Sequence, residues 1–177
     1  MSAEETEEEN LEEINRLVLD LSLVTALPVG TKEKSYTQAA AAATALANRV
    51  SVLDKTKLRQ FEWTVKPLLE LLVQDIENTV AVKAALALQA LMQSRICMAQ
   101  LIEAEGLHCI SKVLDILLTK RIADISSPTT IRASVENLAI CYREVARYYP
   151  WEIVKCGGLR HCVTLLKSGD VALKTIS

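Results

Sequence analysis

The sequence predicts an all-α protein built as an array of stacked helical repeats, an α-solenoid, and three observations support this fold class. Three similar hydrophobic stretches, VKPLLELL, LHCISKVL and LRHCVTLL, begin at Val65, Leu107 and Leu159, which are 42 and 52 residues apart. Their apolar positions share a spacing of three, three and one, which is typical of a buried helix face. Alanine and leucine are abundant, whereas only five glycines and four prolines occur, and this favours packed helices over a sheet.

Charge is distributed unevenly along the 177 residues. Seven of the 22 acidic residues lie within the first thirteen positions, which contain no Lys or Arg. Residues 1–9 are therefore predicted to form a disordered acidic tail. The rest of the chain has 20 basic and 15 acidic residues, but the basic ones are dispersed. A solvated surface is favoured over a nucleic-acid-binding stripe, so we expect no nucleic-acid partner.

The first helical segment, residues 10–53, is predicted to be a pair of N-terminal capping helices or a partial repeat. One helix is expected from about Leu11 to Leu27, where Pro28 would stop it, and the alanine-rich residues 39–50 are expected to form a packing surface. Residues 54–94 then contain one complete three-helix unit: a short helix to about Trp63, a second at 65–74 and a third at about 79–93.

The next unit, residues 95–149, is predicted to have helices at 96–104, 107–119 and 128–148. Third helices align as Ala39, Ala81 and Ala133, with the same offsets of 42 and 52 residues as the second helices. The ten extra residues are therefore expected in an inserted loop at about 115–130. Insertions in repeat proteins often lie at a binding face, although a plain loop extension is the alternative.

Residues 150–177 are predicted to begin a further, truncated repeat. Because an unfinished repeat array exposes apolar surface, we expect the natural chain to continue into further repeats or to pack on another chain.

The sequence IVKCGGLRHCVTLLKSGDVALKTIS at 153–177 resembles an armadillo repeat, the unit of β-catenin and importin-α. LIEAEGL at 101–107 and ALQALMQS at 87–94 are similar to the corresponding parts of the preceding repeat. The resemblance covers about residues 36–177. It implies a right-handed superhelix of three-helix repeats, in which third helices line a groove that binds extended peptides or other proteins.

The importin-α type of groove holds nuclear localisation signals between a ladder of tryptophans and a ladder of asparagines. Carried over to this sequence, the tryptophan positions fall on Ala47, Gln89 and Cys141, and the asparagine positions fall on Ser51, Gln93 and Val145. None matches, so the resemblance does not imply binding of nuclear signals.

The β-catenin type of groove instead uses Lys and Arg against acidic partners. Candidate partner-binding residues are the polar and basic side chains expected on the third helices and in the insertion, namely Asn48, Lys83, Gln89, Gln93, Lys120, Arg121, Arg132 and Asn137, with Arg143 near the same face.

The sequence offers no pattern for catalytic, metal or cofactor sites. His161 lies near Cys156 and Cys162, but neighbouring helical residues point apart, and no second pair of metal ligands follows at a typical spacing. The glycines at 106 and 157–158 belong to no phosphate-binding motif. We therefore expect no enzyme activity and no cofactor.

The function predicted from the sequence is a non-enzymatic scaffold that binds a partner protein or peptide. The alternative is the targeting arm of a larger enzyme or regulator whose catalytic domain lies beyond Ser177, and nucleic-acid binding by the basic body of the chain is a further, less favoured one. No membrane span or secretory signal is found, and the five cysteines form no C-x-x-C pair, which points to a reducing compartment. A cytoplasmic location is expected, with the nucleus as an alternative.

Overall fold

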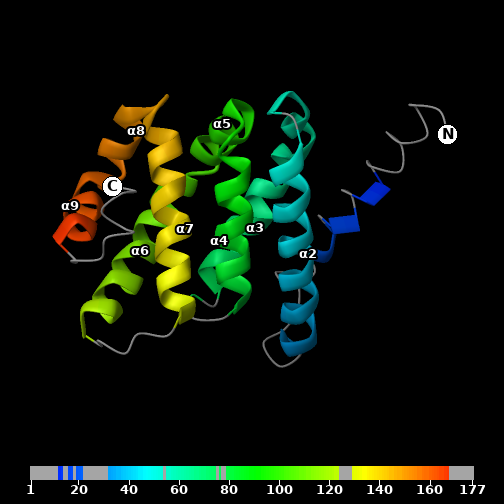
Figure 1. Ribbon diagram of the computed structural model, residues 1–177, viewed down its shortest axis with the longest axis horizontal. Coiled ribbons are helices and arrows are strands. Elements are labelled where there is room, and N and C mark those ends of the chain that lie inside the picture. The colour runs from blue at the N-terminus through cyan, green and yellow to red at the C-terminus, as the bar shows by residue number, and fades with distance from the viewer. Residues whose placement is uncertain are drawn as a thin grey trace.

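The fold was analysed in a computed structural model, which describes residues 12–13, 16–17, 19–21, 32–53, 55–74, 76, 79–123 and 129–167. Nearly all of these residues are helical, and none of them is in a strand. The helices stand side by side along the array (Figure 1). The predicted all-α repeat array is therefore confirmed.

The helices follow one another as a first, a second and a third helix in each repeat. In chain order they are α2 (Lys32–Val52), the 3₁₀ helix η1 (Lys55–Thr64), α3 (Val65–Gln74), α4 (Thr79–Leu91), α5 (Arg95–Glu103), α6 (Gly106–Ala123), α7 (Thr129–Ala146), α8 (Pro150–Lys155) and α9 (Gly158–Lys167). One repeat is thus η1, α3 and α4, and the next is α5, α6 and α7.

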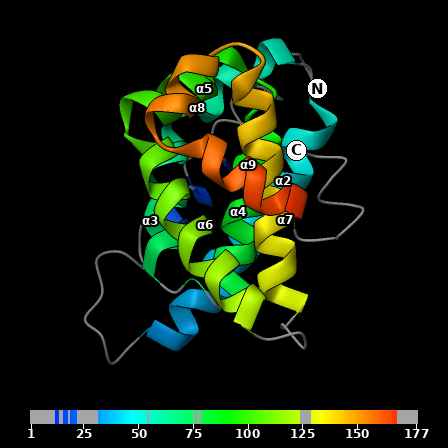
Figure 2. The same ribbon diagram turned by 90° about the vertical axis from the view of Figure 1, so that its left-hand side faces the viewer.

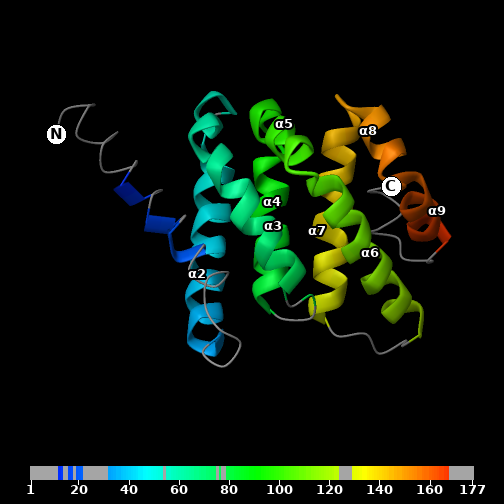
Figure 3. The ribbon, with the colours of Figure 1, turned by 180° about the vertical axis from the view of Figure 1, so that it is seen from behind.

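The helices form two layers. α2 packs on α4 and α4 packs on α7, which makes a layer of third helices (Figure 1). Behind it α3 packs on α6 and α6 packs on α9, which makes a layer of second helices (Figure 3). Seen along the array, α5 and α8 lie together at one end of the two layers (Figure 2).

Small side chains line the contact between α2 and α4. Ala39 and Ala43 on α2 and Ala81, Ala84 and Ala85 on α4 are completely buried. Because these side chains are short, the two helix backbones can approach closely, as the alanine-rich segment predicts.

The turns between first and second helices repeat at an offset of 52 residues. A Cβ atom at Gly106 would lie 2.5 Å from Leu101 Cδ1 and 2.8 Å from the Leu101 carbonyl oxygen. At Gly158 it would lie 2.6 Å from Ile153 Cγ2 and 2.9 Å from the Ile153 carbonyl oxygen. Both glycines are therefore required by the close approach of the preceding helix. The residue before each has a positive φ, 54° at Glu105 and 80° at Gly157.

The third helices do not share this offset, so the alignment of Ala81 with Ala133 is wrong. Ala81 is completely buried, whereas Ala133 is half-buried. An offset of 54 residues matches the burial patterns of α4 and α7, because it pairs buried residues such as Leu88 with Tyr142 and Leu91 with Val145. Alanine fits both buried and exposed helix positions, so aligned alanines could not establish the register.

The insertion is also more helical than predicted. α6 has 18 residues, whereas α3 and α9 have 10 each, and it runs through residue 123, four residues past the helix end expected at 119 and into the expected loop. Leu117 and Leu118 are buried, so apolar contacts support this helical extension. Residues 129–130 begin α7, and residues 124–128 lie outside the described part of the chain.

A helical N-terminal segment packs at the α2 end of the array. Within the expected helix 11–27, the described residues 12–13, 16–17 and 19–21 are helical, and Leu17 and Leu21 are buried. Glu13 forms an ion pair with Arg49 of α2. The predicted tail at 1–9 and the end of the chain at 168–177 lie outside the described residues.

Candidate functional site

The solvent-facing side of the third helices is the surface where the resemblance places partner binding, and we call it the third-helix face. On α4 and the turn after it, the face consists of Thr79, Val82, Lys83, Leu86, Gln89 and Gln93. On α7 and the turn after it, the residues at an offset of 54 are Ala133, Glu136, Asn137, Ile140, Arg143 and Arg147. Every one of these residues is exposed or half-buried, so the two helices present matching rows to solvent.

Most of the candidate residues lie on these helices. Asn48, Gln93 and Arg132 are exposed, and the remaining three, Lys83, Gln89 and Asn137, are half-buried. Lys120 and Arg121 lie instead on α6, in the layer of second helices, and their side chains are outside the described part of the structure. The candidates from the insertion are therefore not brought onto the third-helix face.

The rows on α4 and α7 combine amides with cations. At the offset of 54, Lys83 matches Asn137, Gln89 matches Arg143, and Gln93 matches Arg147. Each matched pair thus contains one amide, which can both donate and accept hydrogen bonds, and one cation, which can bind a carboxylate.

Two glutamates on α7 partly neutralise its arginines. Arg132 Nε lies 2.9 Å from Glu136 Oε1. Glu144 accepts hydrogen bonds from Arg143 at 2.9 Å and from Arg147 at 2.7 Å. Over α4, α7 and the turns that follow them, the described surface therefore carries four cations against two anions.

Sequence reasoning missed Arg147 and the two glutamates. The i,i+4 spacing of Arg132 and Glu136, and the i,i+3 spacing of Glu144 and Arg147, could have indicated them, because residues so spaced are neighbours on a helix.

Three of the six positions carried over for the tryptophan and asparagine ladders are in the core. Ala47, Cys141 and Val145 are buried, so they cannot hold a peptide. The structural counterparts of Gln89 and Gln93 on α7 are Arg143 and Arg147. The two tryptophans of the chain lie elsewhere, in η1 and α8, so the third-helix face has no tryptophan ladder.

The histidine and thiols near α9 form no nucleophilic site. His161 Nε2 lies 2.9 Å from Asp115 Oδ1, and its other nitrogen, Nδ1, is buried without a hydrogen-bond partner among the described residues. Burial raises the pKa of the Cys162 thiol, which disfavours the reactive thiolate. Among the described residues, no group of three or more His, Cys, Asp or Glu side chains is placed to hold a metal ion.

Comparisons with known proteins identify the fold. No family model and no curated protein sequence matches the chain. An engineered protein matches with a TM-score of 0.67 and 20% identity, over 91% of this chain and 59% of that one. A designed armadillo repeat protein in complex with the peptide (KR)4 matches with a TM-score of 0.69 and 18% identity, over 95% of this chain and 64% of that one. The chain thus has an armadillo-like repeat fold and spans less than two thirds of either neighbour.

No helix in the described part of the chain is long and apolar enough to cross a membrane.

Proposed function

We propose that this armadillo-like repeat chain is a non-enzymatic scaffold, which binds an extended, acidic segment of a partner protein on its third-helix face. The observation that carries the proposal is the matched row of amide and cation pairs on α4 and α7. The amides of Gln89, Gln93 and Asn137 would bond to the peptide backbone of the partner, and Lys83, Arg143 and Arg147 would bind its carboxylates.

Charge supports an acidic partner. The surface over α4, α7 and the turns that follow them has an excess of two positive charges, and both of its glutamates already pair with arginines. The designed neighbour shows that an armadillo repeat protein can bind a peptide, but that peptide, (KR)4, is basic. Since like charges would oppose each other here, we expect the opposite preference in this chain.

The binding residues we propose are Lys83, Gln89, Gln93, Asn137, Arg143 and Arg147 of the third-helix face, with Asn48 of α2 and Arg132 of α7 as further candidates. Lys120 and Arg121 are not included, because they lie on α6 in the other layer.

The test compares two fluorescein-labelled peptides, (DE)4 and (KR)4, by fluorescence anisotropy with the full chain. We expect (DE)4 to bind and (KR)4 not to bind. The double variant Gln89→Glu, Gln93→Glu should weaken (DE)4 roughly five- to thirtyfold, because each new carboxylate repels the peptide.

A matched control is Lys112→Gln with Lys167→Gln, which makes the same change in net charge on exposed residues of α6 and α9. Equal weakening in the control and the double variant would contradict a specific face, and so would failure of the unmodified chain to bind (DE)4. A DNA duplex titrated at two salt concentrations tests the nucleic-acid alternative, because phosphate contacts weaken steeply with salt.

A further inference from the structure

Two contacts between successive repeats can be compared residue by residue in the layer of second helices. The contact of α6 with α8 and α9 is closed by polar side chains, and we call it the sealed interface. Ser111 Oγ donates a hydrogen bond of 2.8 Å to the Cys156 carbonyl oxygen. Asp115 lies 2.9 Å from the buried His161 Nε2 and accepts hydrogen bonds of 2.6 and 2.8 Å from Arg160. A hollow of about 290 Å³ remains beside this contact.

The equivalent contact of α3 with α5 and α6 lacks these bonds. At the offsets of 42 and 52 residues, Leu69 stands in place of Ser111, Val73 in place of Asp115, and Cys109 in place of His161. Leucine and valine cannot form hydrogen bonds with their side chains, and Cys109 is shorter than histidine. A cleft of about 960 Å³ therefore remains here, which we call the inter-repeat cleft.

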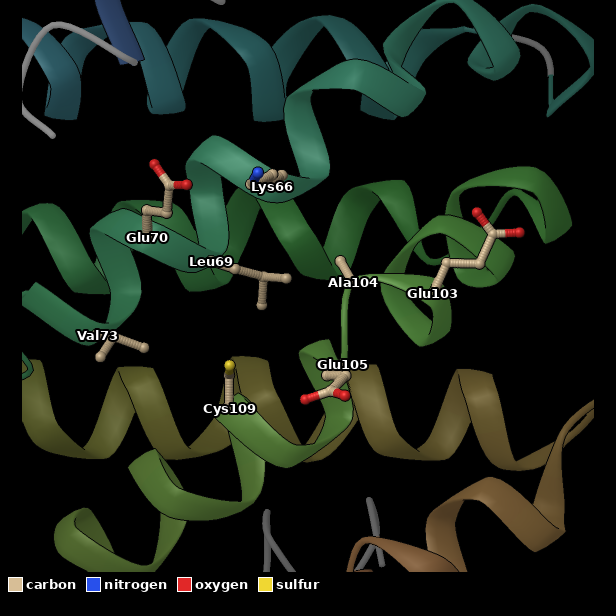
Figure 4. A pocket seen from close by; sticks show the side chains of 8 residues that line it. All are labelled: Lys66, Leu69, Glu70, Val73, Glu103, Ala104, Glu105 and Cys109. Atoms are coloured by element: carbon tan, nitrogen blue, oxygen red, sulfur yellow. The ribbon is translucent and has the colours of Figure 1, made fainter. Parts of the chain in front are cut away.

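The cleft has an apolar floor and an acidic rim. Leu69 and Val73 point into it from α3, and the Cys109 sulfur points into it from α6 (Figure 4). The charged lining residues are Lys66, Glu70, Glu103 and Glu105. None of the three carboxylates forms an ion pair with a described residue; Glu103 accepts only a hydrogen bond of 3.0 Å from Gln100.

The carboxylates that line the cleft are not repeated at the equivalent positions of the sealed interface. In the sealed interface, Lys112 stands at the position of Glu70, Lys155 at that of Glu103, and Gly157 at that of Glu105. Two of these three positions are therefore acidic at one interface and basic at the next, and the third loses its charge. Repeat packing alone does not require three carboxylates around an apolar floor.

We propose that the inter-repeat cleft is a second docking site, which binds a basic amphipathic segment of a protein. One or two apolar side chains of that segment would cover Leu69, Val73 and Cys109, while its Lys or Arg side chains would lie against Glu70, Glu103 and Glu105. The charge complementarity defines the partner. This site is independent of the third-helix face, because it lies in the other layer and has the opposite charge.

The probe for the test is the fluorescein-labelled peptide KLLKKLLKKLLK, and ELLEELLEELLE is its control of opposite charge. We expect the basic peptide to bind the full chain in anisotropy measurements, and the acidic peptide, which the third-helix face would bind, to leave Cys109 in the cleft unprotected. Glu70→Gln and Glu105→Gln should each weaken binding of the basic peptide roughly two- to fivefold, which is the range of exposed ion pairs. Gln89→Glu with Gln93→Glu, on the third-helix face, should leave it unchanged.

A second variant separates docking from general attraction between charges. Val73→Asp with Cys109→His transplants the pair that closes the sealed interface, and it should reduce binding of the basic peptide at least tenfold. Because this variant adds a carboxylate, an effect of net charge alone would strengthen binding, and that result would overturn the proposal.

Alkylation of Cys109 tests docking in the unmodified chain, so the result does not depend on whether a variant folds. We expect saturating basic peptide to slow the alkylation of Cys109 by iodoacetamide at least fivefold while leaving the half-buried Cys162 unaffected, measured by peptide mass spectrometry. Unchanged alkylation of Cys109, or equal protection of Cys109 by the acidic peptide, would refute docking in the cleft.

Discussion

The contact of α3 with α6 and the contact of α6 with α9 join successive repeats through the same layer of helices, but their side chains differ. The first leaves an acidic cleft of about 960 Å³, and the second is closed by Asp115, His161 and Ser111. The helix array therefore sets the positions of the second helices, whereas a few side chains at equivalent positions decide whether the space between them is filled. The following changes test this difference.

The largest effect is expected from Gly158→Ala at the sealed interface. The new Cβ atom would lie 2.6 Å from Ile153 Cγ2, 2.9 Å from the Ile153 carbonyl oxygen and 3.2 Å from Tyr142, so the helices must separate. We expect a loss of roughly 2–3 kcal/mol in the free energy of unfolding, measured in urea, as for other overpacked cores.

Gly106→Ala is the counterpart at the open interface. Part of its clash is with Leu69 Cδ1, which lines the cleft and has room to move. Its loss of stability should therefore be no larger than that of Gly158→Ala, and a larger loss would contradict the contrast between the interfaces.

Asp115→Ala should cause the next largest loss in the free energy of unfolding. It leaves Nε2 of His161, a side chain only 1% exposed, without its partner, and an unsatisfied buried group costs about 1–2 kcal/mol. The control Arg160→Ala removes only an exposed ion pair and should cost at most about 0.5 kcal/mol. Equal losses in the two variants would show that the bond to His161 does not seal the interface.

Combining Val73→Asp with Cys109→His should give a smaller, favourable coupling in the free energy of unfolding. A double-mutant cycle of unfolding free energies should give a coupling of about 0.5–1.5 kcal/mol, the usual net contribution of one hydrogen bond. Purely additive single effects would mean that the two positions do not face each other as Asp115 and His161 do.

Thiol reactivity distinguishes the interfaces without changing the stability. Burial raises the pKa of the Cys97 thiol to about 11 and also raises that of Cys141, and both side chains are completely buried. Cys109, half-buried at the cleft, should therefore be alkylated much faster than either at pH 7.5. Reaction of Cys97 at the rate of Cys109 would contradict the described packing.

The sequence predicts the second helices and their turns well because several constraints coincide there. Leu68 and Ile110 must be buried, and Gly106 and Gly158 must lack a side chain beside the preceding helix. Only one alignment of the second helices satisfies all of these requirements. The third helices are less constrained, since alanine fits any helix position, and the register of α7 was therefore predicted incorrectly by two residues.

The candidate site is only partly predictable for a related reason. The sequence identifies Lys83 and Asn137 as polar residues of third helices, but only the corrected register pairs them across α4 and α7. The inter-repeat cleft depends on Val73 and Cys109, which lie 36 positions apart and align with Asp115 and His161 at two different offsets. An absent hydrogen bond leaves no signal in a hydrophobic pattern, so the cleft became visible only in three dimensions.

The positive φ of Glu105 means that selection for stability and selection for binding would favour different residues at this position. Its φ of 54° is one that glycine adopts freely and other residues adopt at a cost of roughly 1 kcal/mol, and the next repeat has Gly157 at this position. A library of variants screened only for heat resistance should therefore accumulate Glu105→Gly. A library screened for capture of a basic peptide should retain the carboxylate. The residue recovered at position 105 would thus record which pressure, stability or recognition, had acted on the chain.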